Sequence, residues 1–455
     1  MSKYRPYITD DGSIGLFSGD YDDIFHSRYG ALTEAYEKFI LPINLEKYLN
    51  KAELNVLDIC YGIGYNTKAF LNHLINEIIK TKGNVSIYSD NCTRHKDRLS
   101  IETLVTDKST SSFSDSQNKN RISPDNERQE EINSYENTAS KKLIKYNYKN
   151  NINDIIQNMP QINISALEFE QEFVDISPLI KEVCYSEKYK ILPEVNDFIY
   201  EQLINQYGND YFSRIKTYAS NFQGASGILK THFKFFDTSK VKSVLKGQRK
   251  GYKYVLKNVL KPLLHNIYYR HVSKRLNDNC ANFNSGFYQN VSKQLFSKIN
   301  VKFFTEDARI SIMSLNEQFD LIFLDAFTPS KLPTLWTVEF FKELYKKLSD
   351  NGVLLTYTNS ARVRSAMIKA GFYIGNIKSD DNHLLGTIAT KNSENINCPL
   401  SPKELGLLNT KAGIPYRDIN LNLSKDEILA LLENEIQNSN KMSSSQYLKG
   451  VTNEI

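Results

Sequence analysis

The chain has 455 residues, with 57 Lys and Arg against 52 Asp and Glu, and a formal net charge of +5. This length exceeds one typical domain, so we expect long insertions. A near-balanced charge by itself predicts no nucleic-acid partner. The five cysteines are scattered and form no CxxC pair, which argues against a disulfide framework or a zinc site. The sequence has no signal-peptide core and no apolar run of about 18 residues. We therefore expect a cytoplasmic protein without a membrane segment.

Composition and pattern divide the chain into regions. Strands that alternate with helices predict an α/β fold with a mostly parallel sheet. One stretch is rich in Ser, Asn, Asp and Lys and cannot bury enough apolar area to offset chain entropy, so we expect a disordered insertion there. We expect residues 1–50 to form an N-terminal substrate-side segment. Residues 51–88 and 160–395 should form a core in two parts, with a helical basic insertion at about 180–299. The low-complexity insertion spans residues 89–150, and a C-terminal extension spans residues 396–455.

A glycine turn, DICYGIG, follows the first apolar strand and precedes a helix that begins near Asn66. Glycines let the backbone turn sharply and approach a ligand, and the helix start offers free N–H groups. A dinucleotide site would require GxGxxG, which this turn does not complete. An S-adenosylmethionine site usually shows an acid followed by three alternating glycines. Asp58, Gly62 and Gly64 match that pattern, while Cys60 replaces the first glycine; a purely structural turn remains an alternative.

Two further acids end apolar strands. Glu168, in SALEFE, fits the acid that accepts both ribose hydroxyls of a cofactor, with Glu170 as a nearby competitor. Its distance of 110 residues from Asp58 exceeds the usual spacing of about 20, and the low-complexity insertion accounts for the excess. Asp307, in FFTEDARISI, is a candidate acceptor for an adenine amino group. The alternatives are a solvated acid for Glu168 and a helix N-cap for Asp307.

The run FDLIFLDAFTPSKLPTLWT predicts a second part of the site. A buried strand from Leu321 to Leu324 delivers Asp325 to a sheet edge, and Thr328 and Pro329 then break the strand. A helix ending near Gly352 and an apolar strand from 353 to 357 follow. Ligands of open α/β sheets bind beyond the carboxyl ends of the strands. A carboxylate in a proline-shaped loop at such an edge indicates a site for an amine or a nucleobase.

These residues resemble the methyltransferase domain of the bacterial MnmC family. LDAFTPSKLPTLWT is the specific part, and GVLLTYTNSARVRSAMIKAGF, EDAR, FHSRYGALTEA, SALEFE and the tail KAGIPYRDINLN are also similar to family segments. The resemblance covers less than half of the chain, in separated blocks. The residues that match the specific run are Asp325, Ala326, Phe327, Pro329, Lys331, Pro333 and Trp336, the last being the only tryptophan.

The resemblance implies a Rossmann-like class I methyltransferase that uses S-adenosyl-L-methionine to convert 5-aminomethyl-2-thiouridine to 5-methylaminomethyl-2-thiouridine at the tRNA wobble position. The anticodon stem-loop would be the partner. Asp325 would hold the amine and take or relay its proton, or only orient it. Phe327 or Trp336 would stack on the flipped base, with a core position as the alternative. Lys331, Arg362 and Arg364 would meet anticodon phosphates, with a solvated face as the alternative.

Two departures from the family pattern qualify this interpretation. Cys60 stands at a glycine position, and the chain lacks a second glycine-rich turn for the FAD-dependent oxidase of two-domain members, so we expect neither FAD nor a metal cofactor. Two rival functions remain open. One is methyl or aminopropyl transfer to a small free amine, and the other is RNA binding without catalysis.

Residues 241–276 provide separate support for a nucleic-acid partner. This stretch holds ten Lys or Arg and no acid, with tyrosines interleaved. Basic side chains attract phosphates in a salt-sensitive way, and aromatic side chains stack on bases. A helix with one solvated basic face is the alternative.

Neutralising Lys246, Arg249, Lys250 and Lys253 together tests the RNA interpretation. We expect weaker tRNA binding and a smaller salt dependence, because fewer counterions are released when fewer phosphates are neutralised. Filter binding of tRNA at several salt concentrations measures both. Binding of S-adenosylmethionine to the same variant is the control and should not change.

Overall fold

The computed structural model describes residues 4–18, 23–27, 29–80, 152–180, 189–221 and 285–452. The chain forms two compact units, Met1–Asn76 with Met159–Ile455, and Glu77–Asn158. Of the second unit, the described residues are the end of helix α3 (Tyr65–Lys80) and helix α6 (Ile152–Asn158). The predicted insertion at 89–150 and the basic residues Lys246, Arg249, Lys250 and Lys253 lie outside the described residues.

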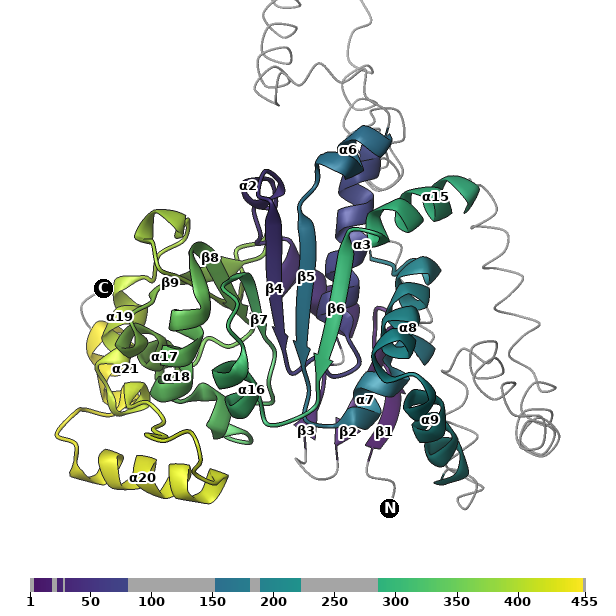
Figure 1. Cartoon of the computed structure of the whole chain (residues 1–455). Helices are drawn as coiled ribbons and strands as arrows, with labels where there is room; N and C mark the ends of the chain where they lie inside the picture. The colour runs from purple at the N-terminus through teal and green to yellow at the C-terminus, as the bar shows by residue number, and fades with distance from the viewer. Residues whose placement is uncertain are drawn as a thin grey trace, which may run out of the picture. The chain divides into compact units, whose positions relative to one another are not determined.

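A seven-stranded sheet forms the centre of the first unit, with the order β6-β5-β4-β7-β8-β10-β9 (Figure 1). The first five strands in this order are parallel, and β10 and β9 run antiparallel. This confirms the predicted α/β fold with a mostly parallel sheet. The strands are β4 (Glu53–Ile59), β5 (Gln161–Leu167), β6 (Ile299–Phe304), β7 (Phe319–Leu324), β8 (Leu348–Thr356), β9 (Tyr373–Lys378) and β10 (Leu384–Thr390).

The pairing register brings the carboxyl ends of neighbouring strands to one edge. Ile59 at the end of β4 pairs with Leu167 of β5 and with Leu324 of β7. The chain order reverses between β4 and β7, and this is the switch point at which open α/β sheets bind ligands. Strand β8 starts at Leu348, earlier than the predicted 353, because Leu348 already pairs with Phe319.

Helices pack beside the sheet in the described part of the first unit. Helices α8 and α15 contact β6, and α17 packs against α18. The helical elements are α1 (Ala31–Glu34), η1 (Ala35–Ile40), α2 (Glu46–Leu49), α7 (Gln171–Ile176), η2 (Ser177–Leu179), α8 (Pro193–Tyr207), α9 (Asn209–Asn221), α15 (Ser285–Phe296), α16 (Ala308–Ser314), η6 (Pro333–Trp336), α17 (Val338–Lys347), α18 (Ala361–Ala370), η7 (Ser393–Asn395), α19 (Pro402–Leu408), η8 (Lys411–Gly413), α20 (Lys425–Asn438) and α21 (Ser444–Thr452). None of the described helices is long and apolar enough to cross a membrane.

The N-terminal segment forms a small antiparallel sheet that the sequence did not predict. Its strands are β1 (Tyr4–Ile8), β2 (Ile14–Ser18) and β3 (Asp23–Ile24). Buried Asp11, in the β1–β2 turn, accepts hydrogen bonds from Thr9, Ser13 and Thr33 at 2.7–2.9 Å. Because Thr33 belongs to α1, this carboxylate ties the small sheet to the helix. The tie fixes the segment between β3 and α1, which reaches the carboxyl edge of the central sheet.

The C-terminal extension is bound to the sheet domain by buried polar contacts. The N–H of Val338 donates to the carbonyl of Tyr416, and Glu339 accepts from the N–H of Asp418 at 2.8 Å. Asp418 is fully buried and accepts a 2.8 Å hydrogen bond from Arg309 of α16. A buried charge is tolerated when it is paired in this way. The extension therefore packs as part of the domain.

Trp336 anchors the core at the loop after β7. Its side chain is 0% exposed, and its indole N–H donates to the carbonyl of Phe327 at 3.0 Å. Its ring meets that of Tyr357 edge-on, with centroids 6.0 Å apart. The indole thus supports Phe327 and Tyr357 from the core side.

As Trp336 is the only tryptophan, its fluorescence reports this burial directly. We expect a blue-shifted emission that a charged quencher barely reduces. Replacing Trp336 by Ala should lower the free energy of unfolding by about 3–5 kcal/mol, because it leaves a large cavity. Urea denaturation measures this loss. Tyr373→Ala is the control, since Tyr373 is half-exposed and its removal should change stability by less than about 0.5 kcal/mol.

Candidate active site

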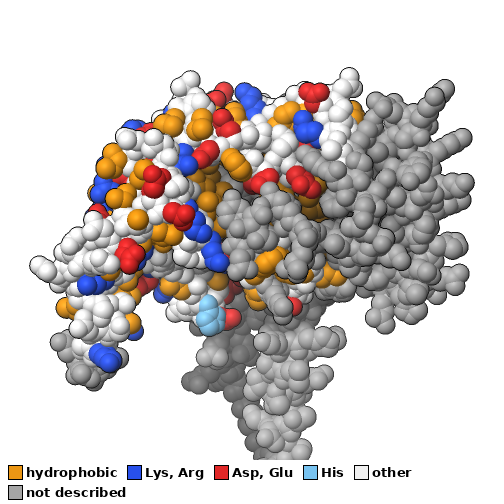
Figure 2. Space-filling model, turned by 90° about the horizontal axis from the view of Figure 1, so that it is seen from below, with side chains coloured by type: hydrophobic (Ala, Val, Ile, Leu, Met, Phe, Trp, Pro, Cys, Tyr) orange, Lys and Arg blue, Asp and Glu red, His pale blue; other side chains and the backbone are white. Residues whose placement is uncertain are grey.

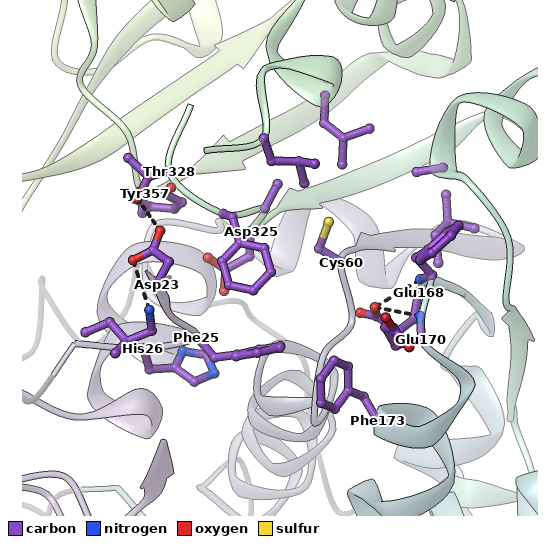
Figure 3. A pocket seen from close by; sticks show the side chains of 18 of the residues that line it. Asp23, Phe25, His26, Cys60, Glu168, Glu170, Phe173, Asp325, Thr328 and Tyr357 are labelled. Atoms are coloured by element: carbon purple, nitrogen blue, oxygen red, sulfur yellow. Dashed lines mark hydrogen bonds between the residues drawn. The ribbon is translucent and has the colours of Figure 1, made fainter. Parts of the chain in front are cut away.

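A cavity of about 480 Å³ opens at the carboxyl edge of the sheet. Segments that follow β3, β4, β5, β6, β7 and β8 all contribute to its wall. Figure 3 shows Cys60 between Asp325 and Glu168, with Phe25 and His26 on the facing side. The lining residues are Asp23, Ile24, Phe25, His26, Ser27, Glu34, Lys38, Phe39, Cys60, Leu167, Glu168, Phe169, Glu170, Phe173, Asp307, Ala308, Arg309, Asp325, Ala326, Phe327, Thr328, Leu332, Thr334, Leu335 and Tyr357.

The turn after β4 has the backbone conformation that the glycine pattern predicts. Cys60, Gly62 and Gly64 have φ values of 64°, 54° and 84°, in the left-handed region that favours glycine. Cys60 therefore takes up a conformation that a glycine at this position would adopt without strain. Burial raises the pKa of the Cys60 thiol well above its ordinary value, so the thiol stays protonated.

Asp58 lies beneath this turn, fully buried at the end of β4. Its Oδ2 accepts a 2.6 Å hydrogen bond from the Thr67 hydroxyl. Among the described residues its Oδ1 has no hydrogen-bond partner. Burial raises the pKa of Asp58 to about 7, although the hydrogen bond from Thr67 favours the charged form. A buried carboxylate oxygen of this kind is suited to a cationic hydrogen-bond donor.

Glu168 follows β5 and is held by backbone groups. Its Oε2 accepts from the N–H of Gly62 at 2.7 Å, and its Oε1 accepts from the N–H groups of Phe169 and Glu170 at 2.9 and 3.1 Å. Burial raises the pKa of Glu168 to about 7 despite these three bonds. The carboxylate thus joins the glycine turn to the end of β5 and faces the cavity.

Asp325 follows β7, on the other side of the switch point. The side chain of Asn66 donates to its Oδ2 at 3.0 Å, and its own N–H donates to the carbonyl of Ile59. Burial raises the pKa of Asp325, while nearby His26 and the Asn66 hydrogen bond oppose that rise. The structure therefore brings Asp325 and Glu168 into one cavity, beside the turn that covers Asp58.

Asp307 has two roles in the structure. It caps α16 by accepting the N–H of Arg309 at 2.9 Å, and it also lines the cavity. The Arg309 guanidinium bonds to Asp307 at 2.7 Å and to Asp418 at 2.8 Å. The N-cap interpretation is confirmed, and contact with an adenine amino group stays a prediction.

The N-terminal segment supplies part of the cavity wall. Thr328 donates to Asp23 at 2.7 Å, which links β3 to the loop after β7. The Phe25 ring meets those of Phe173 and Phe327 edge-on, at centroid distances of 4.7 and 4.9 Å. Phe25 begins the segment FHSRYGALTEA, which resembles a family segment, but the sequence assigns it no role, because its position depends on the small antiparallel sheet.

Several predicted substrate contacts do not fit the structure. Trp336 is fully buried, so it cannot stack on a substrate base, whereas Phe327 does line the cavity. Pro329 is buried and Lys331 is partly buried, and neither belongs to the cavity wall.

The two arginines of α18 are used inside the protein. Arg364 is 2% exposed and donates to Thr387, Glu404, Asn359 and Asn376, so it is not available to a phosphate. Arg362 donates to the carbonyl of Ile414 and lies over the Tyr416 ring. Both side chains connect α18 to neighbouring segments, and the phosphate-binding interpretation of Arg364 is wrong.

The residues at the switch point fit S-adenosylmethionine. Asp58 presents a buried oxygen that has no hydrogen-bond partner in the described part of the chain, the glycine turn carries three left-handed residues, and Glu168 follows the neighbouring strand. These groups would hold the amino-acid and ribose portions of such a ligand. An α/β sheet with acids at these strand ends is typical of proteins that bind nucleotide-type ligands.

Comparisons with known proteins specify this class further. Residues 271–392 match a family model described as S-adenosyl-L-methionine-dependent methyltransferase. An uncharacterized protein of Methanocaldococcus jannaschii is 34% identical over 136 residues, which are 29% of this chain and 37% of that protein. The tRNA 5-methylaminomethyl-2-thiouridine biosynthesis bifunctional protein MnmC of Pseudomonas putida is 38% identical over 66 residues, which are 14% of this chain and 10% of MnmC.

The chain thus spans well under half the length of both curated relatives. The crystal structure of MNMC2 from Aquifex aeolicus aligns with 96% of this chain and 87% of that chain, at 18% identity and a TM-score of 0.48. The family match over residues 271–392, together with the MnmC matches, confirms the family resemblance seen in the sequence.

The raised pKa values near 7 make stability depend on pH. Between pH 4.5 and 7, Asp58 and Glu168 keep protons in the folded state that the unfolded chain has lost. The folded state therefore binds more protons, and its free energy of unfolding falls as pH rises, by an amount on the order of a few kcal/mol.

Asp58→Asn removes one of these titrations and keeps an oxygen for the Thr67 hydroxyl. We expect the ligand-free variant to lose less stability than the wild type between pH 5 and pH 8, as measured by urea denaturation. Asp381→Asn is the control, because Asp381 is exposed and lies outside the cavity wall. Equal slopes for Asp58→Asn and the wild type would contradict the assignment.

Proposed function

We propose that this protein uses S-adenosyl-L-methionine to methylate the aminomethyl group of a tRNA wobble uridine, converting 5-aminomethyl-2-thiouridine to 5-methylaminomethyl-2-thiouridine. The position of Asp325 carries the proposal: its carboxylate lies in the cavity at the switch point, across from Glu168. The family match supports methyl transfer from S-adenosyl-L-methionine, and the name of the MnmC relatives supports the tRNA nucleoside as acceptor.

The charge of the cavity wall favours cationic ligands. Among the described residues that line it, acids outnumber bases, since the only Lys or Arg of that set are Lys38 and Arg309. Each of these two is already paired, Lys38 with Glu34 and Arg309 with Asp307, both at 2.7 Å. The acids of the wall are Asp23, Glu34, Glu168, Glu170, Asp307 and Asp325. A sulfonium and an alkylammonium both suit such a wall electrostatically.

The residues of the wall and of the turn beside it divide between two tasks. Asp58, the glycine turn and Glu168 would hold the cofactor, which when bound supplies an electrophilic methyl group. Asp325 would hold the ammonium of the acceptor, at the other side of Cys60 (Figure 3). Phe25 and Phe327 would exclude water from the reacting groups and contact the base. Fixing both reactants in one geometry is the main requirement of a methyl transfer.

The described part of the outer face gives no uniform basic surface for RNA. Figure 2 shows this edge of the sheet from below, with Asp, Glu, Lys and Arg side chains interspersed among hydrophobic ones. The basic stretch at 241–276 lies outside the described residues, so the phosphate contacts proposed for Lys246, Arg249, Lys250 and Lys253 stay predictions.

Methyl transfer from labelled S-adenosylmethionine to tRNA bearing 5-aminomethyluridine tests the function, with nucleoside mass analysis as the readout. A gain of one methyl group on the wobble nucleoside is expected. Free polyamines are assayed in parallel, because the acidic cavity also favours a small amine as acceptor. Transfer to polyamines alone would replace the tRNA proposal with that second candidate.

Asp325→Asn tests the role of the carboxylate. The amide keeps the size of the side chain but loses the charge that would pair with the ammonium. We expect kcat/KM for the amine substrate to fall on the order of 100-fold, while S-adenosylmethionine binding measured by calorimetry stays unchanged. The control is Asp350→Asn, because the Asp350 side chain is 96% exposed. Full activity of Asp325→Asn would refute the assignment.

A further inference from the structure

His26 is a titratable residue of the cavity wall that has no part in the roles assigned to Asp58, Glu168 and Asp325. It follows β3, where the small N-terminal sheet reaches the carboxyl edge of the central sheet. Its side chain is 10% exposed and interacts electrostatically with Asp325. Figure 3 shows both side chains in the same part of the cavity. A catalytic role for His26 rests on the proposed amine methylation.

The imidazole of His26 is fixed by its neighbours. Its Nδ1 lies 3.9 Å from Glu34 Oε2, and Glu34 is itself held by Lys38 at 2.7 Å and by the N–H of Ser27 at 3.2 Å. The Tyr65 ring meets the imidazole edge-on at 5.2 Å. The second ring nitrogen, Nε2, is separated from Nδ1 by Cε1.

A proton acceptor that differs from the residue that holds the amine suits the reaction. The acceptor nitrogen is an ammonium before methylation and an ammonium again afterwards, so a permanent carboxylate partner suits both states. If Asp325 took the proton, the methylated cation would form beside a neutral acid in a buried cavity, which is electrostatically unfavourable. A neutral group that can become positive is better suited to the task.

We propose that His26 accepts the proton of the substrate ammonium while Asp325 stays ionised and holds the nitrogen. In this step the N–H bond breaks, its electron pair remains on the amine nitrogen, and the proton moves to Nε2 of His26. The freed pair forms the new N–C bond as the C–S bond of the bound cofactor breaks with its pair left on sulfur. The proton then leaves the imidazolium to solvent.

The groups around His26 suit this cycle. Burial lowers the pKa of His26 below its ordinary value, so the ring is neutral at neutral pH, and the acids Asp325, Glu34 and Asp11 partly oppose that shift. Lys38 acts in the same direction as burial. Once protonated, the imidazolium is stabilised by its electrostatic interactions with Asp325 and Glu34. Tyr7 of β1 donates to the His26 carbonyl and Tyr65 of α3 contacts the ring.

His26→Ala tests the proposal in the full-length enzyme with tRNA bearing 5-aminomethyluridine. At pH 7 we expect kcat to fall at least about 100-fold, the usual size of a general-base contribution. Added imidazole should restore part of it. Without imidazole, activity should return as pH rises toward the ordinary pKa of an alkylamine, about 10, because the substrate then loses its proton unaided.

Controls separate proton transfer from a structural role. S-adenosylmethionine should bind His26→Ala and His26→Asn as it binds the wild type, and neither variant should lose stability enough to unfold. His383→Ala is the matched control, since His383 is exposed in the turn between β9 and β10. It should keep the wild-type kcat and pH profile.

NMR titration gives a readout independent of turnover. The imidazole signal missing from His26→Ala identifies His26, and its pKa should lie below 6.5 in the wild type and still lower in Asp325→Asn, which lacks one stabilising charge. A wild-type kcat in His26→Ala, or a loss that imidazole and alkaline pH both leave unchanged, would overturn the proposal. Absence of methyl transfer by the wild type would instead refute the proposed function itself.

Discussion

The structure depends on the burial of carboxylates at one edge of a parallel sheet. Pairing of β4 with both β5 and β7 aligns their carboxyl ends, so the acids that follow these strands share a low-dielectric space. Burial raises the pKa of Asp58, Glu168 and Asp325 because the ionised forms lose hydration. Like charges this close destabilise the empty site. Cationic ligands remove that destabilisation, so binding and charge are coupled by the architecture of the sheet.

Two segments outside the sheet hold this edge in place. At the N-terminus, the Asp11 carboxylate ties the small sheet to α1 and thereby sets the positions of Phe25 and His26 in the wall. At the other end of the chain, Asp418 binds Arg309, whose guanidinium also binds Asp307. The N-terminal part of the chain therefore supplies residues of the wall, and the C-terminal part supports Arg309 of the wall from behind. Each is anchored through a buried carboxylate rather than through apolar packing alone.

The sequence allowed the central part of this site to be predicted, because strand ends can be read locally. Asp58, Glu168 and Asp325 each follow an apolar run, and parallel pairing then brings them together. His26 could not be found in this way, since its place depends on long-range contacts of a short antiparallel sheet. Trp336 and Arg364 were misassigned for a related reason: aromatic and basic side chains in a functional motif also serve packing and buried hydrogen bonding, and local sequence does not distinguish these uses.

An acidic cavity and the proposed tRNA substrate impose opposite electrostatic demands. The carboxylates that favour a sulfonium and an ammonium repel phosphates, so under the proposed function the tRNA backbone would stay outside the wall while one base enters it. Attraction for the backbone then has to come from elsewhere, and the stretch 241–276, with ten basic residues and no acid, carries suitable charge. Such a separation also creates selectivity. A nucleotide without the aminomethyl cation would bring only its own polar groups into the acidic wall and would lack the charge that compensates the buried carboxylates.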